Sequence, residues 1–186
     1  MEKDIIKNIR NKESAKGGLV LGLMFYLTIL IEYLGVESDL ATQILNFASI
    51  IAYVLVIQFY TKRYAMIRGA RGTSFATAYG FILLTAAFAG VIYGCLYYIQ
   101  TNLIDPGYYQ QLQRQMIIDN PNLSNELKDE AIKVLESGDL GPVTVILSSV
   151  ISTVFTCAFF GLVVAVFAKR APDEPIDTTF QNDNVE

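Results

Sequence analysis

One carboxylate in an apolar setting is the side chain with the strongest claim to chemistry. Glu32 is the only charged residue within the four long apolar runs of the chain. A charge in lipid is costly unless it is paired or hydrated, so an intramembrane carboxylate is a default candidate for proton or ion transfer. Glu32 lies near the end of its run, where its side chain can reach water. Hydration is the favoured interpretation, and a polar pathway is the alternative.

Hydroxyl residues gather in the fourth apolar run and offer a second polar feature. They are Ser148, Ser149, Ser152, Thr153 and Thr156. With Glu32, the residues Ser152 and Thr156 outline a speculative polar pathway. Close packing of helices explains the same small side chains and is the favoured interpretation.

Carboxylates between the third and fourth runs are a third candidate. Asp105, Asp119, Asp129 and Glu130 have the chemistry of acids, bases or metal ligands, as an enzyme acting on lipid would need. Their spacing matches no metal motif, and solvated helix faces explain them. The chain contains no histidine, which excludes bis-His haem, His-ligated zinc or copper, and a Ser-His-Asp triad. We therefore expect no enzymatic activity, no metal site and no cofactor.

The elements that hold these residues follow from hydropathy. Hydrophobic residues make up 53% of the 186-residue chain and charged residues only 17%, against about 25% in a typical soluble domain. Each apolar run approaches or exceeds the roughly 20 residues that a helix needs to cross a bilayer. The predicted fold is all-α, an integral membrane bundle of four transmembrane helices. We expect a single domain over 1–171, with spans at about 17–35, 43–61, 74–100 and 142–168, and a disordered acidic cytoplasmic tail over 172–186.

A polar segment over about 105–138 is expected to form a short extracytoplasmic helical pair between the third and fourth spans. Asp105 and Pro106 are a good helix start, and Asn120-Pro121-Asn122 ends that helix. A second helix is predicted from about Asn125 to Ser137, capped by Ser124 and closed by Gly138.

The basic residues predict the orientation. Of the 14 Lys and Arg residues, we place eleven on one side of the bundle. They are Lys3, Lys7, Arg10, Lys12, Lys16, Lys62, Arg63, Arg68, Arg71, Lys169 and Arg170. The positive-inside rule makes that side cytoplasmic, so both termini are cytoplasmic in a bacterial inner membrane. Lys62, Arg63, Arg68 and Arg71 are also positioned to contact anionic lipid head groups, although orientation alone explains them.

Small residues recur at four-residue spacing in three of the runs. They are Gly18 and Gly22 in the first, Ala86, Gly90 and Gly94 in the third, and Ser149, Thr153, Cys157, Gly161 and Ala165 in the fourth. Small side chains let helix backbones approach closely in lipid, where van der Waals fit drives association. The pattern predicts helix packing within the bundle, with a homo-oligomer or a membrane protein partner as the alternative. No nucleic acid partner is expected.

Certain short motifs resemble a known family. Phe59-Tyr60-Thr61-Lys62-Arg63-Tyr64, Gly72-Thr73-Ser74-Phe75 with Ala78-Tyr79, and Leu103-Ile104-Asp105-Pro106 are similar to a bacterial membrane family catalogued as domain-of-unknown-function family 4199. The resemblance covers about residues 16–170. It implies four spans, a polar helical segment before the fourth span, and no assigned activity. The turn Gly69-Ala70-Arg71-Gly72 and the acidic tail depart from the family pattern.

Three functions remain open at this point. A structural or accessory membrane component is the first expectation, since it needs no catalytic group. A small transporter or channel-forming subunit is the alternative, with Glu32 and the hydroxyl face of the fourth span in its path. An enzyme acting on membrane lipid ranks last.

Overall fold

The computed structural model describes residues 2–33, 39–68, 72–137 and 141–169. Within these residues the chain is all-α, with six α-helices and one short π-helix. They are α1 (Glu2–Tyr33), α2 (Asp39–Arg68), α3 (Phe75–Ile99), the π-helix η2 (Gln100–Ile104), α4 (Pro106–Asp119), α5 (Asn125–Ser137) and α6 (Pro142–Ala168). Gly138, Arg71 and the tail over 172–186 lie outside the described residues.

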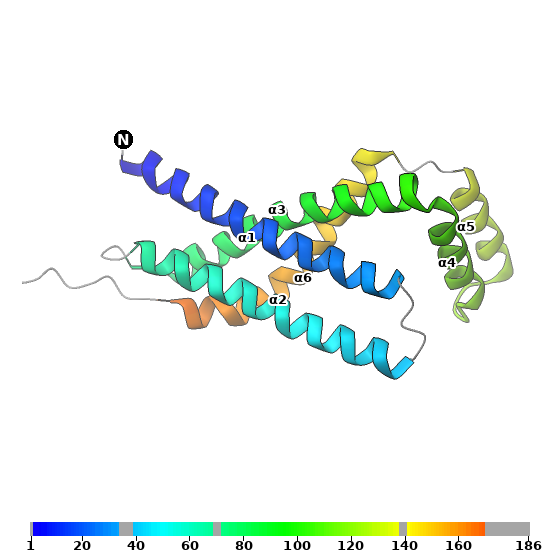
Figure 1. The fold of residues 1–186 in the computed structure, drawn as a ribbon, viewed down its shortest axis with the longest axis horizontal. Helices are drawn as coiled ribbons and strands as arrows, with labels where there is room; N and C mark the ends of the chain where they lie inside the picture. The colour runs from blue at the N-terminus through cyan, green and yellow to red at the C-terminus, as the bar shows by residue number, and fades with distance from the viewer. Residues whose placement is uncertain (1, 34–38, 69–71, 138–140, 170–186) are drawn as a thin grey trace, which may run out of the picture.

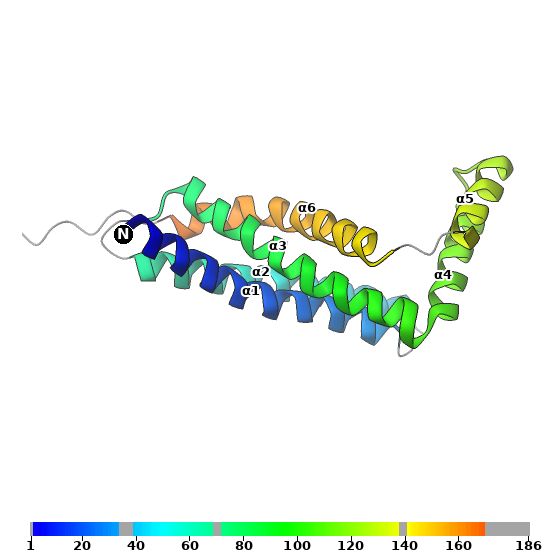
Figure 2. The ribbon, with the colours of Figure 1, turned by 90° about the horizontal axis from the view of Figure 1, so that it is seen from above.

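Four helices are long and apolar enough to cross a membrane, namely α1, α2, α3 with η2, and α6. They lie side by side along one long axis (Figures 1 and 2). The predicted integral membrane bundle is therefore confirmed, and the chain is a multi-pass membrane protein. We call the end where α1 and α3 begin and where α2 and α6 end the basic end of the bundle.

The first two helices extend beyond their expected spans. α1 begins at Glu2 rather than near residue 17, and α2 continues to Arg68 rather than ending near 61. The residues before Gly17 contain no Pro or Gly and are rich in Lys, Glu and Ile, so the chain has no reason to break the helix there. Because of these extensions, charged residues of α1 and α2 lie on neighbouring helices at the basic end.

α3 is the central helix of the bundle. It packs most extensively against α6 and α1, whereas α2 packs more loosely against α1 and α6. Among the described residues, α1 and α6 both pack against α3 but not against each other. The core consists of small and medium side chains, including Leu21, Ile82 and Ala89, all at most 1% exposed.

All ten small residues of the predicted packing set are buried. A methyl group added at Gly18 or Gly22 would meet backbone atoms of Thr85 or Ala89 on α3. A methyl group added at Gly90 or Gly94 would meet Val150 or Ile146 on α6. The structure thus places these four glycines at contacts within one chain, where helix backbones approach closely.

The helical pair α4 and α5 lies across the far end of the bundle rather than along it (Figure 2). Its boundaries agree with those predicted from the sequence. Asn120 Oδ1 accepts a hydrogen bond of 3.0 Å from the Asn122 N–H between the two helices. Ser124 Oγ accepts one of 3.4 Å from the Leu127 N–H, which is the predicted cap of α5.

Candidate functional site

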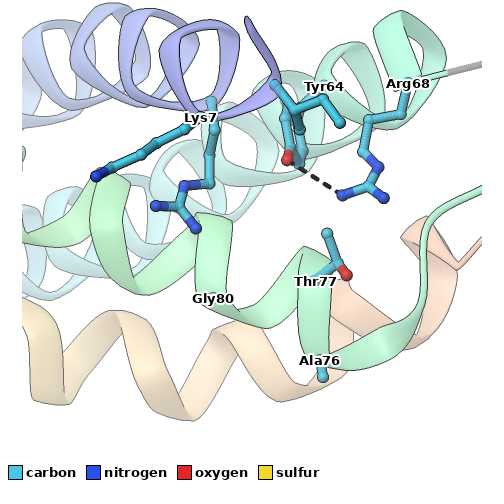
Figure 3. Close-up of a pocket in the computed structure, with 8 residues that line it drawn as sticks. Lys7, Tyr64, Arg68, Ala76, Thr77 and Gly80 are labelled. Atoms are coloured by element: carbon cyan, nitrogen blue, oxygen red, sulfur yellow. Dashed lines mark hydrogen bonds between the residues drawn. The ribbon is translucent and has the colours of Figure 1, made fainter. Parts of the chain in front are cut away.

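A basic pocket lies where α1, α2 and α3 meet at the basic end. Its volume is about 440 Å³. Tyr64 and Arg68 of α2 line one side, Ala76, Thr77 and Gly80 of α3 line the other, and Lys7 of α1 lies at the end farther from Arg68 (Figure 3). Arg10 and Ile6 of α1 complete the lining. The lining therefore brings together three cationic side chains from two helices and includes no carboxylate.

Tyr64 fixes one side of this pocket. Its side chain is fully buried and its ring stacks on Phe81, with ring centroids 4.4 Å apart and planes 7° from parallel. Arg68 donates to the Tyr64 hydroxyl at 3.5 Å and to the Gly72 carbonyl at 3.1 Å. The guanidinium is thus held at the pocket by two acceptors, while an arginine has five N–H donors in all.

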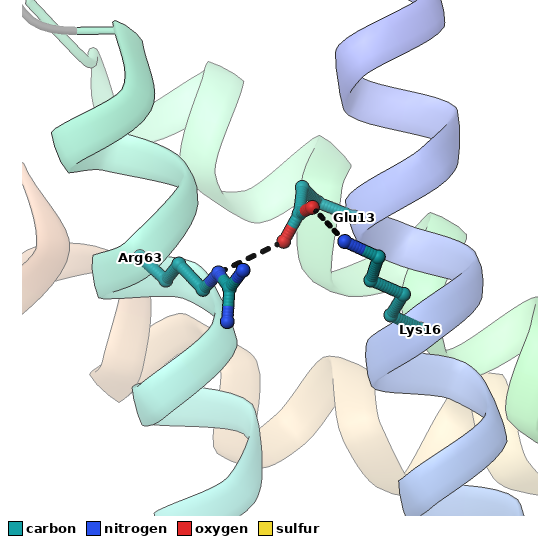
Figure 4. A network of polar contacts seen from close by, with 3 residues as sticks. All are labelled: Glu13, Lys16 and Arg63. Carbon is teal, nitrogen blue, oxygen red and sulfur yellow. Dashed lines mark hydrogen bonds and ion pairs between the residues drawn. The ribbon is translucent and has the colours of Figure 1, made fainter.

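Glu13 forms a second charged cluster at the same end. It is only 5% exposed, and its Oε1 accepts a hydrogen bond of 2.7 Å from Lys16 Nζ (Figure 4). Its Oε2 lies 3.1 Å from Arg63 Nε on α2. This second contact is an ion pair without hydrogen-bond geometry, because Oε2 has no hydrogen-bond partner in the described part of the chain. The cluster joins α1 to α2 one turn beyond the pocket.

Of the four residues predicted to contact lipid head groups, the three that the structure describes have separate surroundings. Lys62 is exposed, Arg63 pairs with Glu13, and Arg68 lines the pocket, whereas Arg71 lies outside the described residues. Lys7 and Arg10 were missed as members of a site because they lie before the predicted first span and were used only to predict orientation. The lack of any helix breaker before Gly17 was the signal that pointed to a continuous helix.

A second, more polar cavity of about 220 Å³ lies between all four transmembrane helices. Its polar lining consists of Thr28, Asn46, Tyr53, Tyr93, Ser152, Thr153 and Thr156. The Thr28 hydroxyl lies 2.6 Å from the Tyr53 hydroxyl and donates to Ser49 Oγ at 3.2 Å. The structure therefore brings Ser152 and Thr156 together with polar groups of α1, α2 and α3.

The other polar residues considered for the pathway, the remaining hydroxyl residues of α6 and Glu32, lie in different places in the structure. Ser149 is buried against Gly90 and Gly94 of α3, and Ser148 donates to the Val145 carbonyl of its own helix at 2.9 Å. Glu32 lies in the last turn of α1, one turn beyond Thr28, and its side chain is outside the described set.

The four candidate carboxylates occupy different positions on the outer segment. Asp105 Oδ2 accepts a hydrogen bond of 3.0 Å from the Tyr33 hydroxyl at the end of α1. Asp119, Asp129 and Glu130 are exposed. Among the described residues, no group of three His, Cys, Asp or Glu side chains is arranged to hold a metal ion.

The chain was compared with protein families, curated proteins and solved structures, and one family matches it. A family described as "Protein of unknown function (DUF4199)" matches residues 16–170, which cover α1 from Lys16 onward, the other three transmembrane helices and the pair between them. No curated protein and no solved structure matches the chain.

Proposed function

The chain belongs to the DUF4199 family of proteins of unknown function, and we propose that it is an accessory component of the bacterial inner membrane that has no catalytic activity and binds a membrane protein partner. One observation carries the proposal. Within the described residues α5 packs against α4 and against no transmembrane helix. The pair is therefore presented at the end of the bundle as a separate surface.

The charge distribution supports placing this pair outside the cytoplasm. Lys7, Arg10, Lys62, Arg63 and Arg68 all lie on α1 or α2 at the basic end, opposite to the pair. The positive-inside rule assigns the basic end to the cytoplasm. By this argument both termini are cytoplasmic and α4 and α5 face the periplasm.

The exposed side chains of α5 define the partner's chemistry. Glu126, Asp129 and Glu130 are exposed beside Leu127, which is 52% exposed. Lys128 donates to the Ile118 carbonyl at the end of α4, and with the exposed Lys133 it only partly offsets these carboxylates. The complementary surface is apolar at its centre and carries Lys or Arg at its rim, as protein interfaces commonly do.

Photo-crosslinking in intact cells tests the accessory role. A photoreactive residue at Leu127 should yield one protein adduct of defined mass, because this position faces the partner. The matched control is the same residue at Phe155, which is 79% exposed on the apolar surface of α6 and should give lipid adducts. A triple charge reversal to Lys at Glu126, Asp129 and Glu130 should abolish the protein adduct. Only lipid adducts at Leu127, or an adduct that survives the reversal, would contradict the proposal.

The polar cavity supports a second candidate, a small transporter or channel-forming subunit. Its lining comes from four helices, and the loosely packed α2 is the helix best able to move. Proteoliposomes with an entrapped pH-sensitive dye and an imposed proton gradient test this function. Flux that is lost in Glu32→Gln and in Thr156→Val would place this candidate first. Absence of flux above that of protein-free vesicles would dismiss proton transport.

A further inference from the structure

The basic pocket has an excess of positive charge that its lining does not neutralise. Lys7, Arg10 and Arg68 share one cavity. The nearest described carboxylate on α1, Glu13, is already engaged by Lys16 and Arg63. Like charges around a partly enclosed space repel each other unless a counter-ion is bound. We propose that this pocket binds a phosphate group, carried either by a membrane lipid or by a soluble phosphate compound.

Donors in the pocket suit a tetrahedral anion. Arg68 is held by Tyr64 and Gly72, so its guanidinium is positioned in advance and keeps further N–H groups for a ligand. Nε of Arg10 is buried and has no hydrogen-bond partner among the described residues. An unsatisfied buried donor is costly, and an anion beside the Arg10 guanidinium would offset its positive charge.

The first turn of α3 adds to the positive potential. Ala76 and Thr77 line the pocket, and α3 begins at Phe75. The partial positive charge at the start of a helix favours anions, and this effect acts together with the three cationic side chains. Thr77 also contributes a hydroxyl group, which lies 2.9 Å from Ser74 Oγ.

The size of the pocket and its mixed lining restrict the class of ligand that fits it. A volume of about 440 Å³ exceeds the need of an inorganic phosphate ion, so a phosphate with an attached organic group fits better. The apolar side chain of Ile6 shares the lining with the cations. A glycerophosphate head group matches this mixture. Basic pockets between membrane helices bind anionic head groups in general, and a free phosphomonoester has the same chemistry.

Gly80 provides a way to block the pocket without changing any charge. A methyl group at this glycine would meet nothing within 4 Å, so a larger side chain can enter the cavity without displacing backbone. Gly80→Leu should therefore fold and fill the site. Lys7→Gln removes one exposed cation and disturbs no described contact. Lys62→Gln is the control, because Lys62 is an exposed base of α2 that does not line the pocket.

Two binding measurements on the full-length protein distinguish the sources of phosphate. In the first, the protein is extracted gently from vesicles of equal parts phosphatidylcholine and phosphatidylglycerol, and native mass spectrometry counts the retained lipids. In the second, thermal stability in lipid-free detergent is measured with inorganic phosphate or glycerol 3-phosphate. Gly80→Leu should abolish binding because its side chain fills the site, and Lys7→Gln should weaken binding by about tenfold, the scale expected for a lost charge-assisted hydrogen bond. Lys62→Gln should leave it unchanged.

Each outcome decides the proposal. Selective retention of phosphatidylglycerol that Gly80→Leu abolishes assigns the site to a lipid phosphate. Stabilisation by a soluble phosphate, without lipid retention and with the same response to the variants, assigns it to a soluble ligand. No binding of either kind would overturn the proposal, and so would binding that Lys62→Gln weakens as much as Gly80→Leu does.

Discussion

Gly90 on α3 lies directly against the backbone of Val150 on α6. A methyl group at Gly90 would be 2.5 Å from the Val150 Cα and 3.1 Å from the Ser149 carbonyl oxygen. These neighbours are backbone atoms, which cannot turn away as a side chain can. The contact between the two most apolar helices of the bundle therefore depends on the absence of a side chain at this position.

We expect Gly90→Ala to destabilise the bundle by about 1–3 kcal/mol, because overpacking forces the helices apart. Gly161→Ala should cost less, since the added methyl would meet a side-chain atom, Ile82 Cγ2 at 2.8 Å, and no backbone atom of another helix. Gly80→Ala is the control and should stabilise the protein by about 0.5–1 kcal/mol, because alanine favours the helix and the space is open. Thermal unfolding in one detergent ranks the three variants. Equal loss in Gly90→Ala and Gly161→Ala would show that backbone contact is not the cause.

The pairing of Glu13 with Arg63 should stabilise the protein more than its pairing with Lys16. Arg63→Gln leaves a carboxylate that is 5% exposed without its partner on α2, and we expect a loss of about 2 kcal/mol. Lys16→Gln removes a contact within α1 and should cost about 0.5 kcal/mol, the usual value for a solvated pair. Double-mutant cycles with Glu13→Gln, read by denaturant unfolding, give the two coupling energies. The prediction is wrong if the Lys16 coupling is the larger.

The hydrogen bond from Tyr33 to Asp105 should restrain the outer pair. Asp105 immediately precedes α4, and its carboxylate accepts from the end of α1 at 3.0 Å. We expect Tyr33→Phe to raise amide hydrogen exchange in α4 and to leave exchange in α3 and α6 unchanged. Tyr98→Phe is the control for removal of a tyrosine hydroxyl near the same end. Unchanged exchange in α4 would show that the pair is held by other contacts.

Membrane orientation can be measured with single cysteines. In a background with Cys95 and Cys157 replaced by alanine, Ser124→Cys should react with an impermeant thiol reagent in intact cells, since we place this position in the periplasm. Lys62→Cys should react only after the membrane is permeabilised, because the positive-inside rule places it in the cytoplasm. The reverse pattern would invert the proposed topology.

Short sequence signals predicted the boundaries of α4 and α5 correctly. Pro106, Asn120-Pro121-Asn122 and Ser124 act on the backbone within one turn, so their effect does not depend on the rest of the chain. α4 and α5 accordingly begin and end where the sequence predicts. The start of α1 and the end of α2 lie beyond the predicted spans, because hydropathy marks where lipid begins and not where a helix stops. A helix that continues into water keeps its hydrogen bonds and needs a breaker to end it.

Hydropathy, charge and the spacing of small residues were enough to predict an all-α bundle of four transmembrane helices, because the cost of burying a polar backbone or a charge in lipid acts on each segment separately. Which side chains share a site depends on how the helices pack. Only the tertiary structure placed Lys7 and Arg10 beside Arg68, and Thr28 beside Tyr53, because these contacts join helices that are distant in sequence. The close approach of backbones at Gly18 and Gly90 determines how the helices are arranged, and with it where both cavities lie.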